Sequence, residues 1–432
     1  MSNTDDRNET RRRIRGILGG SAGNLVEWYD WYVYSAFTLY FAPAFFPTSN
    51  PTTQLLNAAA IFAVGFLMRP LGAWIMGIYA DRHGRKSGLT LSVSLMCGGS
   101  LLIAVTPGYA VIGTAAPAIL LFARLLQGLS VGGEYGASAT YLSEMASKER
   151  RGFFSSFQYV TLIGGQLLAL ATLLVLQAVL SEAQLESWGW RIPFVLGAAF
   201  AVVVFFIRRR MSETREFVDA DRSAASRSSA MALFTKHPRE ALTVIAMTAG
   251  GTLAFYTYST YMQKYLVNTS GFSRETATWI MSSALFVYML LQPVAGALSD
   301  RVGRKPLLIA FGAAGMVFTV PILMLLETVT DSFHAFCLVM LMLVIVTGYT
   351  SINAVVKAEL FPAHIRALGV ALPYAIANTV FGGTAEYVAL SFKQGGIERG
   401  FYWYVTAIIA LSFITYLLMP DTRDRSRIVQ SG

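Results

Sequence analysis

Long apolar runs separated by short polar segments make up most of this sequence. About twelve of these runs reach the roughly 20 apolar residues that a helix needs to cross the hydrocarbon core of a bilayer. They lie near residues 16–40, 54–79, 88–105, 116–145, 153–179, 191–207, 241–266, 275–298, 306–326, 332–357, 368–391 and 401–419. The pattern predicts an all-α integral membrane protein with twelve transmembrane helices.

One polar stretch, RRRMSETREFVDADRSAASRSSAMALFTKHPRE at 208–240, divides these spans into two sets of six. It is too charged to enter a bilayer, so we interpret it as a cytoplasmic linker. This predicts an N-terminal six-helix bundle at 16–207 and a C-terminal six-helix bundle at 241–419. Residues 1–15 and 420–432 are predicted to be cytoplasmic tails.

The two halves also share two motifs. GIYADRHGRK at 77–86 and GALSDRVGRK at 296–305 each follow the second span of their half. The other motif, an acid seven residues before an arginine, closes the fourth span of each half as Glu144 with Arg151 and Glu359 with Arg366. Two correspondences indicate a duplicated six-helix unit, and such repeats place a substrate site at their interface near the middle of the membrane.

The composition supports the membrane assignment. Charged residues make up 14% of the chain and hydrophobic residues 54%, whereas a soluble protein carries about 25% charged residues. The formal net charge is +9, yet Lys and Arg gather in alternate loops, which is the pattern of membrane topology and argues against a nucleic-acid partner. By the positive-inside rule both termini are predicted to be cytoplasmic, which requires an even number of spans.

Several motifs resemble known families. The repeated G-x-x-x-D-R-x-G-R-K loop, together with Arg124, Gln127 and Gly128, resembles signatures of the major facilitator superfamily. The stretches GNLVEWYDWYVY, FLMRPLGAW, QGLSVGGEYGASATYLSE and WGWRIPF are similar to the metabolite:proton symporter family. This resemblance implies two pseudo-symmetric bundles, proton-coupled uptake by alternating access, and a place in the bacterial inner membrane.

Within that family the substrate is predicted from further stretches. SFQYVTLIGGQLLAL, TYMQKYLVNT, KAELFPAHIRALGV and FGGTAEYVALS look like the members that carry 2-oxoglutarate, so a small dicarboxylate is expected. The osmosensing members have a long C-terminal heptad extension, whereas this sequence stops at DTRDRSRIVQSG, which weakens the osmolyte interpretation. Citrate and betaine or proline stay open as alternative substrates, and a sensor that does not transport stays open as another class.

The first span contains two carboxylates, Glu27 and Asp30. Asn24, Glu27, Trp31 and Tyr34 share one helical face, and Asp30 lies about 60° away from it. A charge at mid-membrane costs about 2.5–3.5 kcal/mol, so it persists where it is paired, hydrated or functional. Glu27 and Asp30 are therefore candidate proton sites, with an ion pair to an arginine as the alternative; Glu134 on the fourth span is the third candidate.

A dicarboxylate requires positive charge in the cavity. Arg69 and Arg124 lie within spans, and arginine suits a carboxylate because its planar fork donates two parallel hydrogen bonds. We predict that they bind the substrate, although in the superfamily the arginine at Arg124 often partners the proton-carrying acid. Arg191 is either a further contact or an interfacial anchor, and Lys264 either completes the anion site or extends to the membrane surface.

Polar side chains on the fifth and seventh spans are expected to add hydrogen bonds to the substrate or to pack helices together: Tyr159, Gln166, Tyr256 and Gln263. The loop motifs are predicted to form charge pairs between the halves that stabilise the outward-open state and break as the cytoplasmic side opens. The predicted gating residues are Asp81, Arg85, Asp300, Arg304, Glu144, Arg151, Glu359 and Arg366.

No enzyme motif is visible. The sequence has no phosphate-cradling G-x-x-x-x-G-K-[ST], no H-E-x-x-H and no clustered histidines or cysteines, so neither a cofactor nor a metal is expected. Without a nucleotide-binding domain, an ion gradient or the solute's own gradient is the expected driving force. A monomer suffices for this architecture.

Overall fold

The computed structural model describes residues 2–83, 85–132, 134–144, 146–209 and 230–428, and these residues form helices joined by short loops. The first half contains α1 (Ser2–Phe45), α2 (Pro51–His83), α3 (Arg85–Val105), α4 (Tyr109–Ile112), α5 (Ala115–Val131), α6 (Glu134–Glu144), η1 (Lys148–Arg150), α7 (Arg151–Val179), α8 (Glu182–Ser187), η2 (Gly189–Arg191) and α9 (Ile192–Arg209).

The second half contains α11 (Ala230–Lys236), α12 (Pro238–Phe255), η3 (Tyr256–Tyr261), α13 (Met262–Asn268), α14 (Arg274–Val302), α15 (Lys305–Leu326), α16 (Ser332–Thr350), α17 (Asn353–Leu360), η4 (Ala363–Ile365), α18 (Arg366–Ala377), η5 (Asn378–Gly382), α19 (Ala385–Gln394) and α20 (Glu398–Leu418). Joined in chain order, the described helices form twelve spans, which confirms the predicted fold class.

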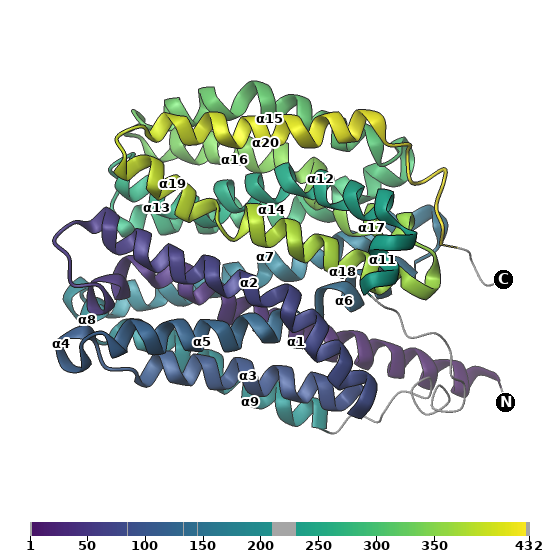
Figure 1. The fold of residues 1–432 in the computed structure, drawn as a ribbon, viewed down its shortest axis with the longest axis horizontal. Helices are drawn as coiled ribbons and strands as arrows, with labels where there is room; N and C mark the ends of the chain where they lie inside the picture. The colour runs from purple at the N-terminus through teal and green to yellow at the C-terminus, as the bar shows by residue number, and fades with distance from the viewer. Residues whose placement is uncertain (1, 84, 133, 145, 210–229, 429–432) are drawn as a thin grey trace.

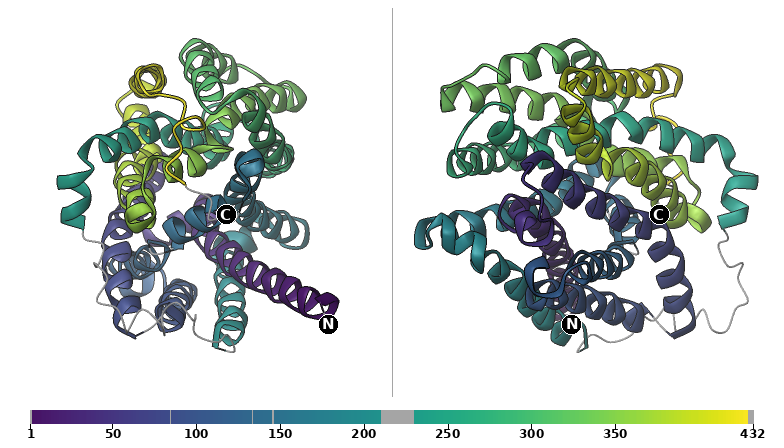
Figure 2. Two further views of the ribbon diagram at one scale, coloured as in Figure 1. Left: turned by 90° about the vertical axis from the view of Figure 1, so that its right-hand side faces the viewer. Right: turned by 60° about the vertical axis from the view of Figure 1, so that its left-hand side comes forward.

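The two halves lie side by side as two helical bundles (Figure 1), the first in purple and blue and the second in green and yellow. Within the first bundle α1 packs on α7, and α2 packs on α5; within the second, α20 packs on α12 and α15. The most extensive contact between the bundles runs along α7 and α14. In Figure 2 the start of α1 extends away from the rest of the first bundle.

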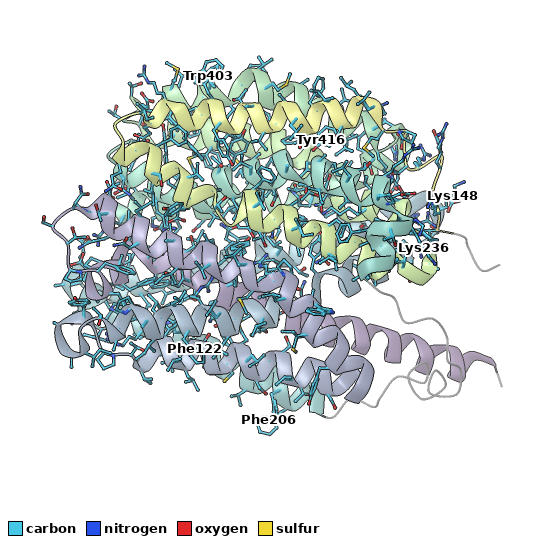
Figure 3. All side chains as sticks on the ribbon, viewed as in Figure 1. Phe122, Lys148, Phe206, Lys236, Trp403 and Tyr416 are labelled. Carbon is cyan, nitrogen blue, oxygen red and sulfur yellow. The ribbon has the colours of Figure 1, made fainter. Side chains whose placement is uncertain are left out.

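The outer surface has the character of a membrane protein. Eight of the described helices are long and apolar enough to cross a membrane by length and composition, and 90–105 and 115–131 are shorter apolar helices. Large apolar side chains such as Phe122, Phe206 and Trp403 point outward from the bundles, whereas Lys148 and Lys236 lie toward one end (Figure 3). Many polar side chains are buried inside the bundles, whereas large apolar side chains are exposed on the outside. This is the arrangement expected of a protein surrounded by lipid.

Three of the described spans are not regular α-helices, which hydropathy does not reveal. The tenth span divides between α16 and α17. The seventh and eleventh spans contain π-helical turns, η3 and η5. Such turns are rare and often occur at functional sites, and discontinuous helices commonly build the binding sites of transporters.

We call the end of the molecule that carries the motif loops the charged end; its described part comprises Glu144 and residues 146–152, 299–305, 359–366 and 420–428. At its centre Gly303 ends α14 with φ 98°, in the left-handed region that favours glycine. A Cβ at Gly303 would also lie 2.3 Å from Oδ2 of Asp421. The glycine of the repeated loop therefore allows both the turn and the close approach of the C-terminal segment.

Candidate functional site

Two buried arginines come from α2 and α5, which pack on each other in the first bundle. Arg69 on α2 and Arg124 on α5 are 3% and 0% exposed. Their guanidinium carbons lie over the ring of Trp31, at 4.3 and 4.0 Å from its centroid. Nε and Nη2 of both arginines have no hydrogen-bond partner within the described part of the chain. The structure therefore brings together two cations with unused donors.

Aromatic rings complete the surroundings of these guanidinium groups. The Arg69 guanidinium lies 4.0 Å from the ring centroid of Phe66, and that of Arg124 lies 4.5 Å from the ring centroid of Tyr34. Cation–π contact favours the charge but leaves the N–H groups without acceptors. Because an unsatisfied buried donor is costly, an anion with several oxygen acceptors suits this place.

Asp30 is connected to Arg124 through two polar side chains. Ser100 donates to Oδ1 of Asp30 at 2.9 Å, and Nε2 of Gln127 donates to Ser100 at 2.9 Å. Nη1 of Arg124 donates to Oε1 of Gln127 at 2.7 Å. The acid and the arginine are thus linked by a relay, and Oδ2 of Asp30 has no hydrogen-bond partner among the described residues.

Gly197 on α9 makes room for the Asp30 carboxylate. A Cβ at this position would lie 1.8 Å from Oδ1 of Asp30, which is well inside van der Waals contact. A larger residue at 197 would displace the carboxylate from Ser100.

Glu27 has a different set of partners. Its Oε1 accepts hydrogen bonds from Ser130 at 2.9 Å and from Ser92 at 3.3 Å. Asn24, on the same face of α1, donates to Thr161 at 2.9 Å. The two carboxylates of α1 therefore have separate hydrogen-bond partners, so each can be tested independently. Glu134 opens α6, and its side chain lies outside the described residues.

The charge in the second half is paired. Nζ of Lys264 lies 2.7 Å from Oε2 of Glu386 and also donates to Ser35 of α1 at 2.7 Å. Lys264 is buried rather than extended to the surface, and Glu386 neutralises it. Glu386 was not among the predicted site residues, although an acid inside the apolar stretch FGGTAEYVALS was the available signal.

A small cavity lies between the halves. Gln166 of α7 and Gln263 of α13 line it, together with Tyr32 and Ser35. The other two predicted hydrogen-bonding residues, Tyr159 and Tyr256, are buried and pack against Phe255.

Arg191 lies elsewhere. Its guanidinium donates to the carbonyl oxygens of Ser187 and Thr106, at 3.2 and 3.1 Å, and stacks on Trp190. These contacts place it in η2, at the end of the bundle opposite the charged end. The structure thus does not bring Arg191 together with Arg69 and Arg124, and its position fits the interfacial-anchor alternative.

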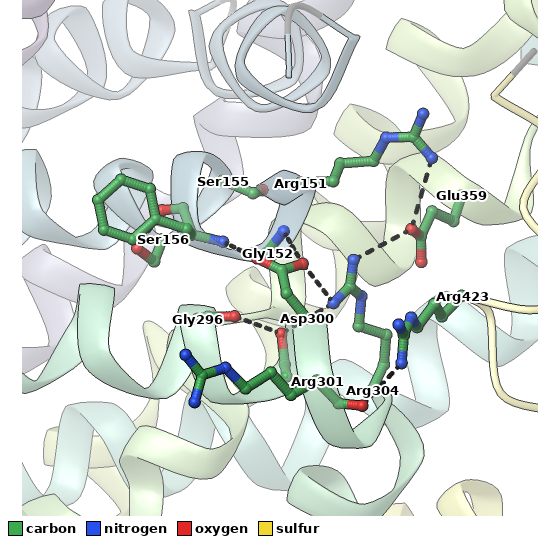
Figure 4. A network of polar contacts seen from close by, with 12 residues as sticks. Arg151, Gly152, Ser155, Ser156, Gly296, Asp300, Arg301, Arg304, Glu359 and Arg423 are labelled. Atoms are coloured by element: carbon green, nitrogen blue, oxygen red, sulfur yellow. Dashed lines mark hydrogen bonds and ion pairs between the residues drawn. The ribbon is translucent and has the colours of Figure 1, made fainter. Parts of the chain in front are cut away.

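Asp300 joins the two halves at the charged end (Figure 4). Its carboxylate accepts hydrogen bonds from the backbone N–H groups of Gly152 and Phe153, at 2.8 and 2.9 Å, at the start of α7. Arg304 donates to the same carboxylate at 2.8 Å. A carboxylate at a helix N-terminus is favoured by the free N–H groups and the helix dipole.

Glu359 forms the second junction. Its Oε1 lies 3.8 Å from Arg151 of the first half and 3.6 Å from Arg304 of the second. Arg366 and Glu144 form a further ion pair between the halves. Six of the eight predicted gating residues thus come together at the charged end. The side chains of the other two, Asp81 and Arg85, lie outside the described residues.

The C-terminal segment covers this network, which the sequence did not indicate. Asp421 accepts from the backbone N–H of Arg304 at 3.2 Å, and Arg366 donates to the carbonyl oxygen of Arg427 at 2.9 Å. Ser426 accepts from Arg151, a residue of the first half, at 3.1 Å. Segment 420–428 therefore contacts both bundles.

Two six-helix bundles that close over buried charges define a membrane transporter of the major facilitator fold. The chain belongs to the sugar (and other) transporter family, whose model matches residues 18–232 and 207–428. The predicted resemblance to the major facilitator superfamily is thereby confirmed. Its relatives are transporters, so the protein is not an enzyme.

Named relatives cover nearly the whole chain. The alpha-ketoglutarate permease of Escherichia coli K12 is 56% identical over 95% of this chain and 94% of its own length. The citrate-proton symporter of Klebsiella pneumoniae is 34% identical over 94% and 92%. The proline/betaine transporter of Escherichia coli K12 is 30% identical over 95% and 84%.

Solved structures show the same fold. The proton:xylose symporter XylE, bound to 6-bromo-6-deoxy-D-glucose, matches with a TM-score of 0.74 at 18% identity, over 95% of this chain and 96% of that one. The partially occluded inward-open form of XylE from E. coli matches with a TM-score of 0.73 at 17% identity, over 94% and 97%.

Proposed function

We propose that this protein is a proton-coupled symporter that takes up a small dicarboxylate, with 2-oxoglutarate as the favoured substrate, by alternating access. The observation that carries the proposal is the pair of buried guanidinium groups, Arg69 and Arg124, whose Nε and Nη2 atoms lack partners in the described structure. The identity of 56% to a permease named for alpha-ketoglutarate supports the same substrate.

The charges of the arginine pair favour an anion over a sugar or a zwitterion. Lys264 is neutralised by Glu386, whereas Arg69 has aromatic rings around its guanidinium. A dianion placed between Arg69 and Arg124 receives charge-assisted hydrogen bonds at each carboxylate, the strong kind of hydrogen bond. A zwitterion such as betaine offers one carboxylate for two arginines and leaves one of them unpaired.

Proton coupling follows from the relay between Asp30 and Arg124. When Asp30 is ionised, its negative charge attracts the Arg124 guanidinium, and the hydrogen bonds through Ser100 and Gln127 hold the two groups in this arrangement. Protonation removes that negative charge, so the positive charge of Arg124 becomes available to a substrate carboxylate. Substrate and proton then bind together, which is the requirement for symport.

The positive-inside rule orients the protein. The charged end, with its many arginines, is assigned to the cytoplasm, so both termini and the linker at 208–240 are cytoplasmic. The protein then spans the inner membrane of a bacterium, with lipid around its apolar periphery, and functions as a monomer. The bundles enclose the site within one chain, so no second subunit is required to complete it.

Purified protein in liposomes tests the proposal. An inward proton gradient is expected to drive accumulation of labelled 2-oxoglutarate, and an uncoupler is expected to abolish it. Unlabelled five-carbon dicarboxylates should compete, and neutral sugars should not. Accumulation of citrate in preference to 2-oxoglutarate would reassign the substrate, and betaine uptake without dicarboxylate uptake would reject the proposal.

Glu359→Gln is expected to loosen the charged end. The change removes the negative charge that Arg151 and Arg304 share, and hydrogen bonds to charged groups contribute about 1.5–3 kcal/mol, so the cytoplasm-open population should rise about tenfold. Spin labels on η1 and α14, at residues 148 and 301, should report longer distances. Glu398→Gln, which breaks a pair with Lys393 at the opposite end, is the control. Unchanged distances in Glu359→Gln would remove Glu359 from the gate.

A further inference from the structure

A second buried lysine, Lys357, lies between the arginine pair and the charged end. It is on α17, two residues before Glu359, and is 0% exposed. Its Nζ donates to Oδ1 of Asn353 at 2.7 Å and to the hydroxyl of Tyr135 at 3.2 Å. It also lies 3.8 Å from the ring centroid of Tyr374. All of these partners, within the described chain, are neutral.

The cation bridges the two halves. Lys357 and Asn353 belong to α17 of the second half, whereas Tyr135 belongs to α6 of the first. The Tyr135 hydroxyl donates to Oδ1 of Asn353 at 2.9 Å, and the Tyr135 ring stacks on that of Tyr374 with centroids 3.8 Å apart. Movement of the first half away from the second at the charged end would therefore remove Tyr135 from the ammonium group.

Tyr374 connects this cluster with the arginine pair. It belongs to α18, which packs on α2, the helix of Arg69, and its ring centroid lies 3.8 Å from Nζ of Lys357. The helix that contacts the Lys357 ammonium thus also contacts the helix of Arg69.

The cost of burying an ammonium indicates that Lys357 has a function. Burial of an unpaired charge costs several kcal/mol, and cation–π contact returns about 2 kcal/mol of this. For Lys264 this cost is offset by an ion pair with the Glu386 carboxylate, whose Oε2 lies 2.7 Å from Nζ. Lys357 has hydroxyl, amide and ring partners, which satisfy N–H groups but do not neutralise the charge. Ionisable residues buried within a span commonly mark an ion or substrate pathway.

We infer that Lys357 is an anion-binding residue of the exit path: when the charged end opens, its ammonium exchanges the Tyr135 hydroxyl for one carboxylate of the departing dicarboxylate. The inference rests on the proposed function and adds a second, cytoplasm-side subsite to it. One carboxylate stays near Arg69 while the other reaches Lys357. This subsite therefore favours substrates with two carboxylates over those with one.

Sided transport kinetics of the full-length protein in membrane vesicles test the inference. We expect Lys357→Gln to raise the KM for 2-oxoglutarate efflux, measured from the cytoplasmic side, about tenfold or more. The reason is that one charge-assisted hydrogen bond contributes about 1.5–3 kcal/mol. The KM for influx should change less than about twofold, because the arginine pair binds the substrate that arrives from outside.

Two controls separate an anion subsite from a structural contact. Lys357→Arg keeps the charge and should restore the efflux KM to within about threefold of the wild type. A monocarboxylate analogue, 2-oxopentanoate, should inhibit efflux equally in the wild type and in Lys357→Gln. Lys393→Gln, which alters a lysine at the opposite end, should leave both KM values unchanged.

Each outcome decides a different point. Equal changes in the influx and efflux KM values, or an unchanged efflux KM in Lys357→Gln, would overturn the exit subsite and leave the proposed function intact. If Lys357→Gln does not fold, as seen by gel filtration, Lys357→Met, which removes the charge but keeps an unbranched apolar side chain, is measured in the same assay, and an unchanged efflux KM in that variant would overturn the exit subsite. A wild-type protein with no saturable dicarboxylate flux would overturn the proposed function together with the subsite.

Discussion

Arg69→Met is expected to weaken the binding of 2-oxoglutarate about 100-fold or more. Two charge-assisted hydrogen bonds from one guanidinium contribute about 3 kcal/mol or more, and each 1.4 kcal/mol corresponds to about a tenfold change in Kd. Arg69 is the sharper test of the arginine pair, since Arg124 also belongs to the relay toward Asp30. Calorimetric titration of the purified protein measures the effect.

Two further variants define what Arg69 contributes. Arg69→Lys keeps the charge but removes the planar fork, so its affinity should lie between those of the wild type and Arg69→Met. Arg191→Met is the matched control, because Arg191 is also stacked on a tryptophan but donates to backbone carbonyls at the opposite end. If Arg191→Met weakens binding as much as Arg69→Met does, the site lies elsewhere than proposed.

Asp30→Asn is expected to abolish proton-driven accumulation while exchange of 2-oxoglutarate across the membrane continues. The amide keeps the volume beside Gly197 and a hydrogen bond to Ser100, but it cannot bind and release a proton. Accumulation under an inward proton gradient should fall about tenfold for each pH unit of the gradient, since one co-transported proton supplies about 1.4 kcal/mol per pH unit and this coupling is lost. Exchange without a gradient should stay within about threefold.

The other candidate acids are compared in the same assay. Glu27→Gln leaves Ser92 and Ser130 able to hydrogen-bond the amide, so we expect accumulation to persist. The acid whose amide variant loses accumulation but keeps exchange is the proton carrier. Loss in Glu27→Gln with persistence in Asp30→Asn would assign the proton to Glu27, and persistence in both would direct attention to Glu134.

The sequence alone predicted the spans, the duplication and the family. These depend on local quantities: the summed transfer free energy of about 20 residues identifies a span, and short motifs identify a family. The cost of an isolated charge in a bilayer likewise marked Asp30, Arg69 and Arg124 as inward-facing. The structure confirmed the fold class and places these three residues in the interior.

Only the tertiary structure decided which charges meet. Lys264 pairs with Glu386, which is 122 residues away along the chain, and Arg366 pairs with Glu144, which is 222 residues away. Such pairings depend on the rotation and packing of helices, and hydropathy carries no information about either. The same holds for Lys357, because only its neighbours in space show that its partners among the described residues are neutral. It also holds for the π-helical turns, since a shift in backbone hydrogen bonding leaves composition unchanged. The sequence by itself thus determined that this protein spans a membrane as two repeated bundles with charges inside. The packing of those bundles decided that two arginines keep unused donors while one lysine is neutralised.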